Sequence, residues 1–116
     1  MKKIEAVIQP YKLMDVKEAL AEIGVTALTM SEVREADCHG RHIEMYRGQE
    51  YTVDFTPRVK LEVMVPNNRA ERAIAVITKA ATTGHDDSGI IAVSSLDDTV
   101  SIQNGQHSAD RGHDER

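Results

Sequence analysis

Two segments of this chain alternate between apolar and polar residues, and each of them ends at a proline. Residues 2–9 read KKIEAVIQ before Pro10, and residues 58–66 read RVKLEVMVP, with Pro66 last. A period of two is typical of a strand with one buried face, and proline cannot continue a sheet ladder. The chain therefore has to build a sheet that is covered on one face.

A helical period follows each of these strands. In residues 11–24 the apolar side chains recur at steps of three and four, and Gly24 supplies a stop. In residues 69–82 alanine and isoleucine line one side of a second helix. Two helices of this kind can cover one face of the sheet.

The remaining segments complete the order of elements. Residues 25–36 and 90–95 are rich in β-branched residues and predict strands, and 99–103 (TVSIQ) predicts a short final strand. Residues 37–53 have no clean period and predict a long loop, which in a compact domain is usually functional. The order is that of an α+β, ferredoxin-like βαββαβ fold over residues 1–103. The polar residues 104–116 predict a mobile tail.

Bulk composition narrows the class of protein. The chain has 116 residues, which is one domain, and a net charge of −5, which argues against nonspecific nucleic-acid binding. It has no apolar run long enough for a bilayer, and its single cysteine, Cys38, can form no internal disulfide. We expect a cytoplasmic chain.

The segment TTGHDDSG, residues 82–89, raises the question of function. Two glycines with polar residues between them are typical of a loop that surrounds a phosphate with main-chain N–H groups. This loop holds Asp86 and Asp87 but no lysine, and Ile90 follows it.

Long stretches of the sequence resemble the PII nitrogen-regulatory signal proteins. They are MKKIEAVIQPYKLMDVKEALAEIGVTALTMSEV at the start and YRGQEYTVDFTPRVKLEVMVP at 46–66. The resemblance runs ungapped from Met1 to Gln103 and weakens beyond Gly84. It implies a homotrimer with adenine nucleotides bound between subunits. It also implies a long loop, here about 37–53, that docks onto membrane transporters or enzymes.

The chain departs from this family where the outer phosphates would bind. The family pattern has a lysine at the end of the 82–90 loop, two arginines on the last strand, and a glutamine at the base of the long loop that is associated with magnesium. This chain has Ile90, Ser101, Gln103 and His39 there. A hydrogen bond to a charged group contributes about 1.5–3 kcal/mol, so losing three cations lowers affinity roughly a thousand-fold or more.

The resemblance therefore implies a nucleotide site that keeps its adenosine end. Positions that match the base and ribose side are Val7, Ala27, Leu28, Thr29, Glu62 and Met64. Positions on the phosphate side are Arg58, Asp87, Ser88, Gly89 and Gln103. Such a site should prefer AMP, ADP or a cyclic nucleotide to Mg-ATP, as a ligand and not as an obligatory cofactor.

Three further groups of residues carry hypotheses. Arg41, Arg47 and Arg58 could clamp a small anion such as bicarbonate, because a guanidinium donates two parallel hydrogen bonds to a carboxylate-shaped group. Arg47, Gln49 and Tyr51 could contact a partner protein, and Tyr51 matches a tyrosine that some PII proteins have modified. Cys38, His39 and His42 are potential zinc, copper or nickel ligands.

Alternative functions remain open at this level. A PII-like metal sensor would act through the cysteine and histidines of the long loop. A conventional nitrogen-regulatory PII protein would respond to ATP and 2-oxoglutarate. An enzyme would need more than His85, Asp86 and Asp87, which are adjacent in one loop with no nucleophile placed beside them. We therefore expect a regulatory protein and not a catalyst.

Overall fold

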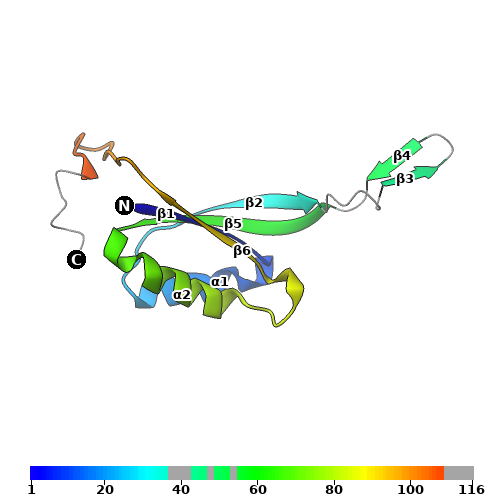
Figure 1. Ribbon diagram of the computed structural model, residues 1–116, viewed down its shortest axis with the longest axis horizontal. Coiled ribbons are helices and arrows are strands. Elements are labelled where there is room, and N and C mark those ends of the chain that lie inside the picture. Colours follow the sequence, from blue (N-terminus) through cyan, green and yellow to red (C-terminus); the bar gives the residue numbers. More distant parts are fainter. Residues whose placement is uncertain (37–42, 47–48, 53–54, 109–116) are drawn as a thin grey trace.

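A computed structural model describes residues 1–36, 43–46, 49–52 and 55–108 of the chain. These residues form an antiparallel four-stranded sheet with two helices on one face (Figure 1). The elements are β1 Lys2–Ile8, the 3₁₀ turn η1 Pro10–Lys12, α1 Leu13–Glu22, β2 Thr29–Ala36, β3 Ile43–Tyr46, β4 Gln49–Thr52, β5 Phe55–Val65, η2 Asn67–Arg69, α2 Ala70–Ala81, η3 Asp86–Ser88 and β6 Gly89–Ser95. The predicted ferredoxin-like βαββαβ fold is confirmed.

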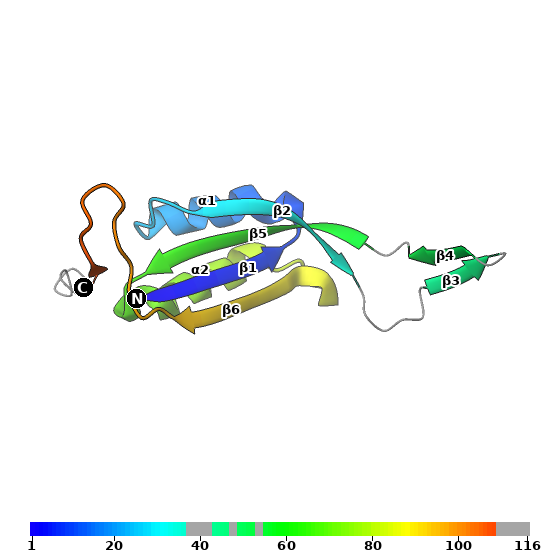
Figure 2. The same cartoon turned by 90° about the horizontal axis from the view of Figure 1, so that it is seen from above.

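The strand order of the sheet is β2-β5-β1-β6 (Figure 2). β1 lies in the middle and pairs with β5 and β6, so that Glu5 is opposite Glu62 on one side and Ala92 on the other. β5 also pairs with β2, which sets Thr29 opposite Glu62. β2 and β6 are therefore the two edges of the sheet, and any ligand that touches both must reach across two strands.

The core lies between the sheet and the helices. Each strand contributes every second residue: Ile4, Ala6 and Ile8 from β1, and Val59, Leu61, Val63 and Val65 from β5, all of them buried. α1 adds Val16 and Leu20, and α2 adds Ala70, Ala73, Ile77 and Ala81. Full burial of one large aliphatic side chain contributes about 1.5–3 kcal/mol, so these two strands and two helices hold the domain together.

The other face of the sheet is charged at its centre. Glu5 and Glu62 are opposite each other, and the Lys3 Nζ lies 3.7 Å from a Glu5 carboxylate oxygen and 3.9 Å from one of Glu62. A side-chain hydrogen bond with Glu62, followed by the attraction of Lys3 and Lys60, lowers the pKa of Glu5. Directly opposed like charges destabilise a sheet unless they are compensated, and here the lysines compensate them.

Two predicted strands differ from the observed ones. The second strand begins at Thr29 and not at Val25, because Val25 and Leu28 pack against the core from an irregular segment. The predicted strand 99–103 does not form. Val100 makes only an isolated bridge with His107, because main-chain bonds and bonds from side chains to main-chain N–H groups fold this segment into a turn instead.

The long loop and the tail are described in part. Within the predicted loop 37–53, β3 and β4 pair as a short antiparallel ribbon. The described part of the predicted tail, 104–108, folds back onto 98–101. No helix in the described residues is long and apolar enough to cross a membrane.

Candidate functional site

The loop 82–89 joins the end of α2 to the start of β6, at the end of the sheet far from the N-terminus (Figures 1 and 2). The Ser88 hydroxyl accepts a hydrogen bond from the Thr83 main-chain N–H at 2.9 Å and donates to the His85 carbonyl at 2.9 Å. The Thr83 hydroxyl lies 2.9 Å from the Ser88 hydroxyl oxygen and donates to the Asp87 carboxylate at 3.1 Å. The loop is thus closed by its own side chains, which also hold the main-chain N–H groups of Thr83, Gly84 and His85. An anion would have to be met by other main-chain N–H groups of the loop.

Gly89 fixes where this loop meets the sheet. Its φ is 126°, and a Cβ at this position would lie 2.0 Å from the carbonyl oxygen of Val7. Only glycine fits such a close approach to a neighbouring strand. The glycine that the sequence suggested for ligand contact is therefore also required by the fold.

A buried amide anchors the loop from the other side, and sequence reasoning missed it. The Gln9 Nε2 donates to the Asp87 carbonyl at 2.9 Å, and its Oε1 accepts from the Arg58 guanidinium at 3.2 Å. Gln9 follows β1 directly, where strand alternation would turn it away from the core, so its burial carries no sequence signal.

Arg58 is held at the base of the long loop. Its Nε lies 3.2 Å from a Glu35 carboxylate oxygen, and its side chain is only 11% exposed. A cavity of about 430 Å³ lies beside it, lined by Arg58 together with Pro10, Glu32, Val33, Arg34, Pro57 and Val59. The predicted anion ligand Arg58 therefore has a protein carboxylate, that of Glu35, as its partner.

Three of the predicted adenosine-side residues, Thr29, Glu62 and Met64, lie on the open face of β2 and β5. The Thr29 hydroxyl faces the Glu62 carbonyl at 3.5 Å, a long hydrogen bond that leaves the hydroxyl available to a ligand. Met64 is 57% exposed on the same face. Ala27 and Leu28 precede the strand and line a cavity of about 580 Å³ against α1.

Within one copy of the chain, most of the predicted adenosine-side residues lie apart from the predicted phosphate-side residues. Thr29 on β2 is level with Ala92 on β6, and three strand spacings of ~4.8 Å separate these edges by roughly 14 Å. Gln103 lies in the turn that follows Ser95, at the opposite end of β6 from loop 82–89. The structure brings together Val7 and Gly89, with Ser88 next in the chain, and the other predicted residues would join them only from a second copy.

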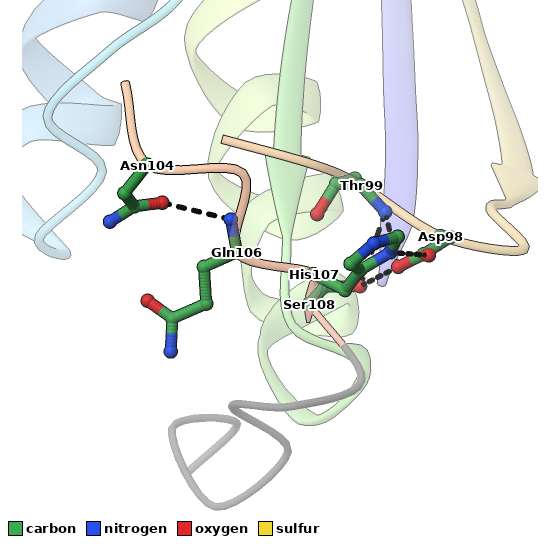
Figure 3. A network of polar contacts seen from close by, with 6 residues as sticks. All are labelled: Asp98, Thr99, Asn104, Gln106, His107 and Ser108. Atoms are coloured by element: carbon green, nitrogen blue, oxygen red, sulfur yellow. Dashed lines mark hydrogen bonds and ion pairs between the residues drawn. The ribbon is translucent and has the colours of Figure 1, made fainter. Parts of the chain in front are cut away.

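The turn that contains Gln103 is built around Asp98 (Figure 3). The Asp98 carboxylate lies 2.5 Å from the His107 Nδ1 and accepts from the Ser108 hydroxyl at 3.0 Å. His107 is the main cause, with a smaller contribution from Ser108, of a lowered pKa for Asp98. The predicted phosphate-side position Gln103 is exposed on this turn, as is Ile102.

Several predicted site residues lie outside the described ones. They are Cys38, His39, Arg41, His42 and Arg47. Gln49 and Tyr51 belong to β4, of which only the backbone is described. Within the described part of the chain, no three potential metal ligands of the His, Cys, Asp and Glu types cluster.

Comparison with known proteins agrees with the fold and with the resemblance of the sequence. The family model of nitrogen regulatory protein P-II matches residues 1–106. The nitrogen regulatory protein P-II of Azospirillum brasilense is 46% identical over 95% of this chain and 98% of its own length. That of Bradyrhizobium diazoefficiens is 44% identical over the same shares, and nitrogen regulatory protein P-II 1 of Escherichia coli is 43% identical over 91% of this chain and 95% of its own. The chain therefore belongs to the P-II family, whose members are trimeric regulatory signal proteins and not enzymes.

Proposed function

We propose that this P-II protein senses an adenine nucleotide with few phosphates, AMP or ADP in preference to Mg-ATP. In this proposal the nucleotide lies in a cleft that is completed by a second copy of the trimer. Loop 82–89 of one copy meets the phosphates, and residues 27–29 of the other hold the base.

The chemistry of the 82–90 loop carries this proposal. The segment contains no lysine or arginine, and the carboxylate of Asp87 is held in it by the Thr83 hydroxyl. The Ser88 hydroxyl is engaged by Thr83 and His85. The loop can offer main-chain N–H groups other than those of Thr83, Gly84 and His85, which are bonded within it. These suit one or two phosphates, whereas a γ-phosphate would meet a carboxylate without a cation.

The adenosine end supports the same proposal. The Thr29 hydroxyl has only a long contact at 3.5 Å with the Glu62 carbonyl. Exposed apolar groups, among them Met64, share its face of the sheet. This face therefore offers a purine the Thr29 hydroxyl and the Met64 side chain, beside the charged residues Glu62 and Lys3.

We further propose a small anion such as bicarbonate as the second effector and a membrane transporter as the target. Arg58, which lines a cavity near the base of the long loop, supplies a guanidinium group for the anion, together with Arg41 and Arg47, which lie outside the described residues. The ribbon β3–β4 supplies the contact surface (Figure 1). Ligand must then bind one conformation of this loop better than the others, so that its population rises.

A conventional P-II function is the second candidate, and the relatives favour it. The compared proteins, at 43–46% identity, are all named nitrogen regulatory proteins. In that case ATP and 2-oxoglutarate would bind together, and other groups would replace the missing cations.

Calorimetric titration separates these candidates. The purified trimer is titrated with AMP, ADP and ATP, each with and without magnesium, and again in bicarbonate and in 2-oxoglutarate. Tighter binding of AMP or ADP than of Mg-ATP is expected, with a gain in bicarbonate. Tight ATP binding that depends on 2-oxoglutarate would establish the conventional function instead.

Thr29→Val tests the adenosine end. Valine has the shape of threonine but cannot hydrogen-bond, so nucleotide affinity should fall roughly three- to tenfold, as expected for one neutral hydrogen bond. Ser31→Ala is the matched control, because it removes a hydroxyl two residues farther along β2. Equal affinity of Thr29→Val and the unaltered protein would show that the base does not bind here.

A further inference from the structure

Gln9 is the one buried polar side chain among residues 1–36 and 55–108, for which burial is described. Both ends of its amide are occupied: the Nε2 by the Asp87 carbonyl at 2.9 Å and the Oε1 by Arg58 at 3.2 Å. A buried amide that loses a partner costs about 1–3 kcal/mol, so this amide is firmly held by two segments far apart in the sequence.

The two partners of Gln9 belong to different functional regions. Asp87 lies in the loop that faces the proposed phosphates. Arg58 lies on β5 and pairs through its Nε with Glu35, one residue before the end of β2, where the long loop begins. A continuous path of polar contacts therefore runs from the Asp87 carbonyl through Gln9 and Arg58 to Glu35.

We infer that Gln9 is a positioning residue that couples loop 82–89 to the base of the long loop. If the Asp87 carbonyl moves, the Gln9 donor is left unsatisfied unless the amide follows it. If the amide follows, Arg58 loses its hydrogen bond to the Gln9 Oε1, and its ion pair with Glu35 becomes its main remaining contact with the path. A displacement at one loop is thereby felt at the other.

The backbone offers a competing route that the test must separate. β1 pairs with both β5 and β6, with Ile8 opposite Val59 on one side and Gly89 on the other. Gln9→Met removes both hydrogen bonds but keeps an unbranched side chain of similar length and the strand ladder. Gln9→Glu keeps an acceptor for Arg58 and loses the donor to Asp87.

Hydrogen exchange on the ligand-free trimer tests the coupling directly. Thr83→Val removes the hydroxyl that holds Ser88 and Asp87, and so loosens the loop at its centre. We expect it to speed exchange of the amides of residues 33–36 roughly threefold or more, as one lost hydrogen bond allows. In the Gln9→Met and Gln9→Glu backgrounds the same substitution should leave these amides unchanged.

Thr78→Val is the matched control. Its hydroxyl donates to the Ile74 carbonyl at 2.8 Å within α2, one turn before the loop and off the polar path. It should leave residues 33–36 unchanged in every background. An equal effect of Thr83→Val with and without Gln9 would assign the coupling to the strand ladder, and no effect in either would show that the loops are independent. Either result overturns the inference.

A second arm adds ADP, and this arm alone rests on the proposed function. Saturating ADP should protect residues 83–90 and 33–36 in the unaltered protein, but only residues 83–90 in Gln9→Met. Loss of protection at both segments in Gln9→Met would mean that Gln9 serves binding and not coupling, against the inference. A protein that binds no nucleotide contradicts the proposed function, and the ligand-free comparison then decides the coupling by itself.

Discussion

The two ends of β6 carry two polar loops of similar design and different attachment. Loop 82–89 precedes the strand and wraps the Asp87 carboxylate with the Thr83 hydroxyl, while turn 97–108 follows it and wraps Asp98 with Ser108 and His107. Both use serine, threonine and aspartate to satisfy main-chain groups locally, which is what these residues do best outside regular elements.

The two loops differ in how they are attached to the sheet. Loop 82–89 meets β1 through Gly89 and through the Gln9 amide. The polar contacts of turn 97–108 shown in Figure 3 stay within the turn, as does the bridge between Val100 and His107. A loop that is fixed to the sheet can pass a ligand signal to the rest of the domain, whereas the contacts of Asp98 and Asn104 shape the turn itself.

The largest expected difference is in the free energy of unfolding, when one methyl group is added to the loop by Gly89→Ala or to the turn by Gly105→Ala. Gly89→Ala places a Cβ 2.0 Å from the Val7 carbonyl oxygen at a φ of 126°, a conformation that is essentially restricted to glycine. We expect the free energy of unfolding to fall by about 3 kcal/mol or more, measured by urea denaturation at one fixed trimer concentration.

Gly105→Ala is the counterpart in the turn. Its φ is 71°, and no atom lies within 4 Å of the added Cβ. The cost is only that of a left-handed backbone, roughly 1 kcal/mol, and it should fall on the turn alone. Equal losses for the two variants would mean that loop 82–89 is no more firmly attached to the sheet than the turn.

A smaller effect is expected from restoring a cation. Ile90 is 66% exposed at the start of β6, and Ile90→Lys would place an ammonium beside the loop. We expect affinity for ATP to rise roughly ten- to a hundred-fold relative to ADP, since a charge-assisted bond contributes about 1.5–3 kcal/mol. Calorimetry with both nucleotides measures this ratio.

Ile102→Lys adds the same charge to the turn at the other end of β6, where Ile102 is fully exposed. It tests whether the gain depends on position or on net charge alone. If both variants raised the ATP to ADP ratio equally, the missing lysine would not explain the proposed nucleotide preference. A larger gain from Ile102→Lys would show that the last segment, and not the loop, meets the outer phosphates.

Much of the fold could be predicted because its signal is local. Alternation in 2–9 and 58–66 identified β1 and β5, and the helical period identified α1 and α2. The strand predicted at 99–103 failed because β-branched residues there compete with Asp98, Ser108 and Asn104, whose side chains bind main-chain N–H groups of the turn. Strand propensity is a property of each residue type and does not include hydrogen bonds from neighbouring side chains.

The candidate site residues rest on resemblance and stay a prediction. Thr29 and Gly89 are proposed because they match a family pattern, whereas the amide of Gln9 matches no pattern of spacing. Its role comes from a strand end, a loop and β5 meeting in space, 78 and 49 residues apart in the sequence. Contacts of this kind are set by the topology of the sheet, which a linear pattern does not express.

The smallest effect is electrostatic and confined to the turn. His107 and, less strongly, Ser108 lower the pKa of Asp98, so NMR titration should find it below the ordinary value of about 3.9. A carboxyl group whose pKa is lowered by folding stabilises the turn above its ordinary pKa, and this contribution is lost as pH falls through the lowered value. His107→Ala should raise the pKa of Asp98 toward its ordinary value, and Ser108→Ala should raise it less. Because the pair is exposed, neither variant should change the unfolding of the sheet measurably.

A pKa of Asp98 that does not respond to His107→Ala would show that the turn is open in solution. A response that also reached the exchange of residues 83–90 would show that the two ends of β6 communicate after all.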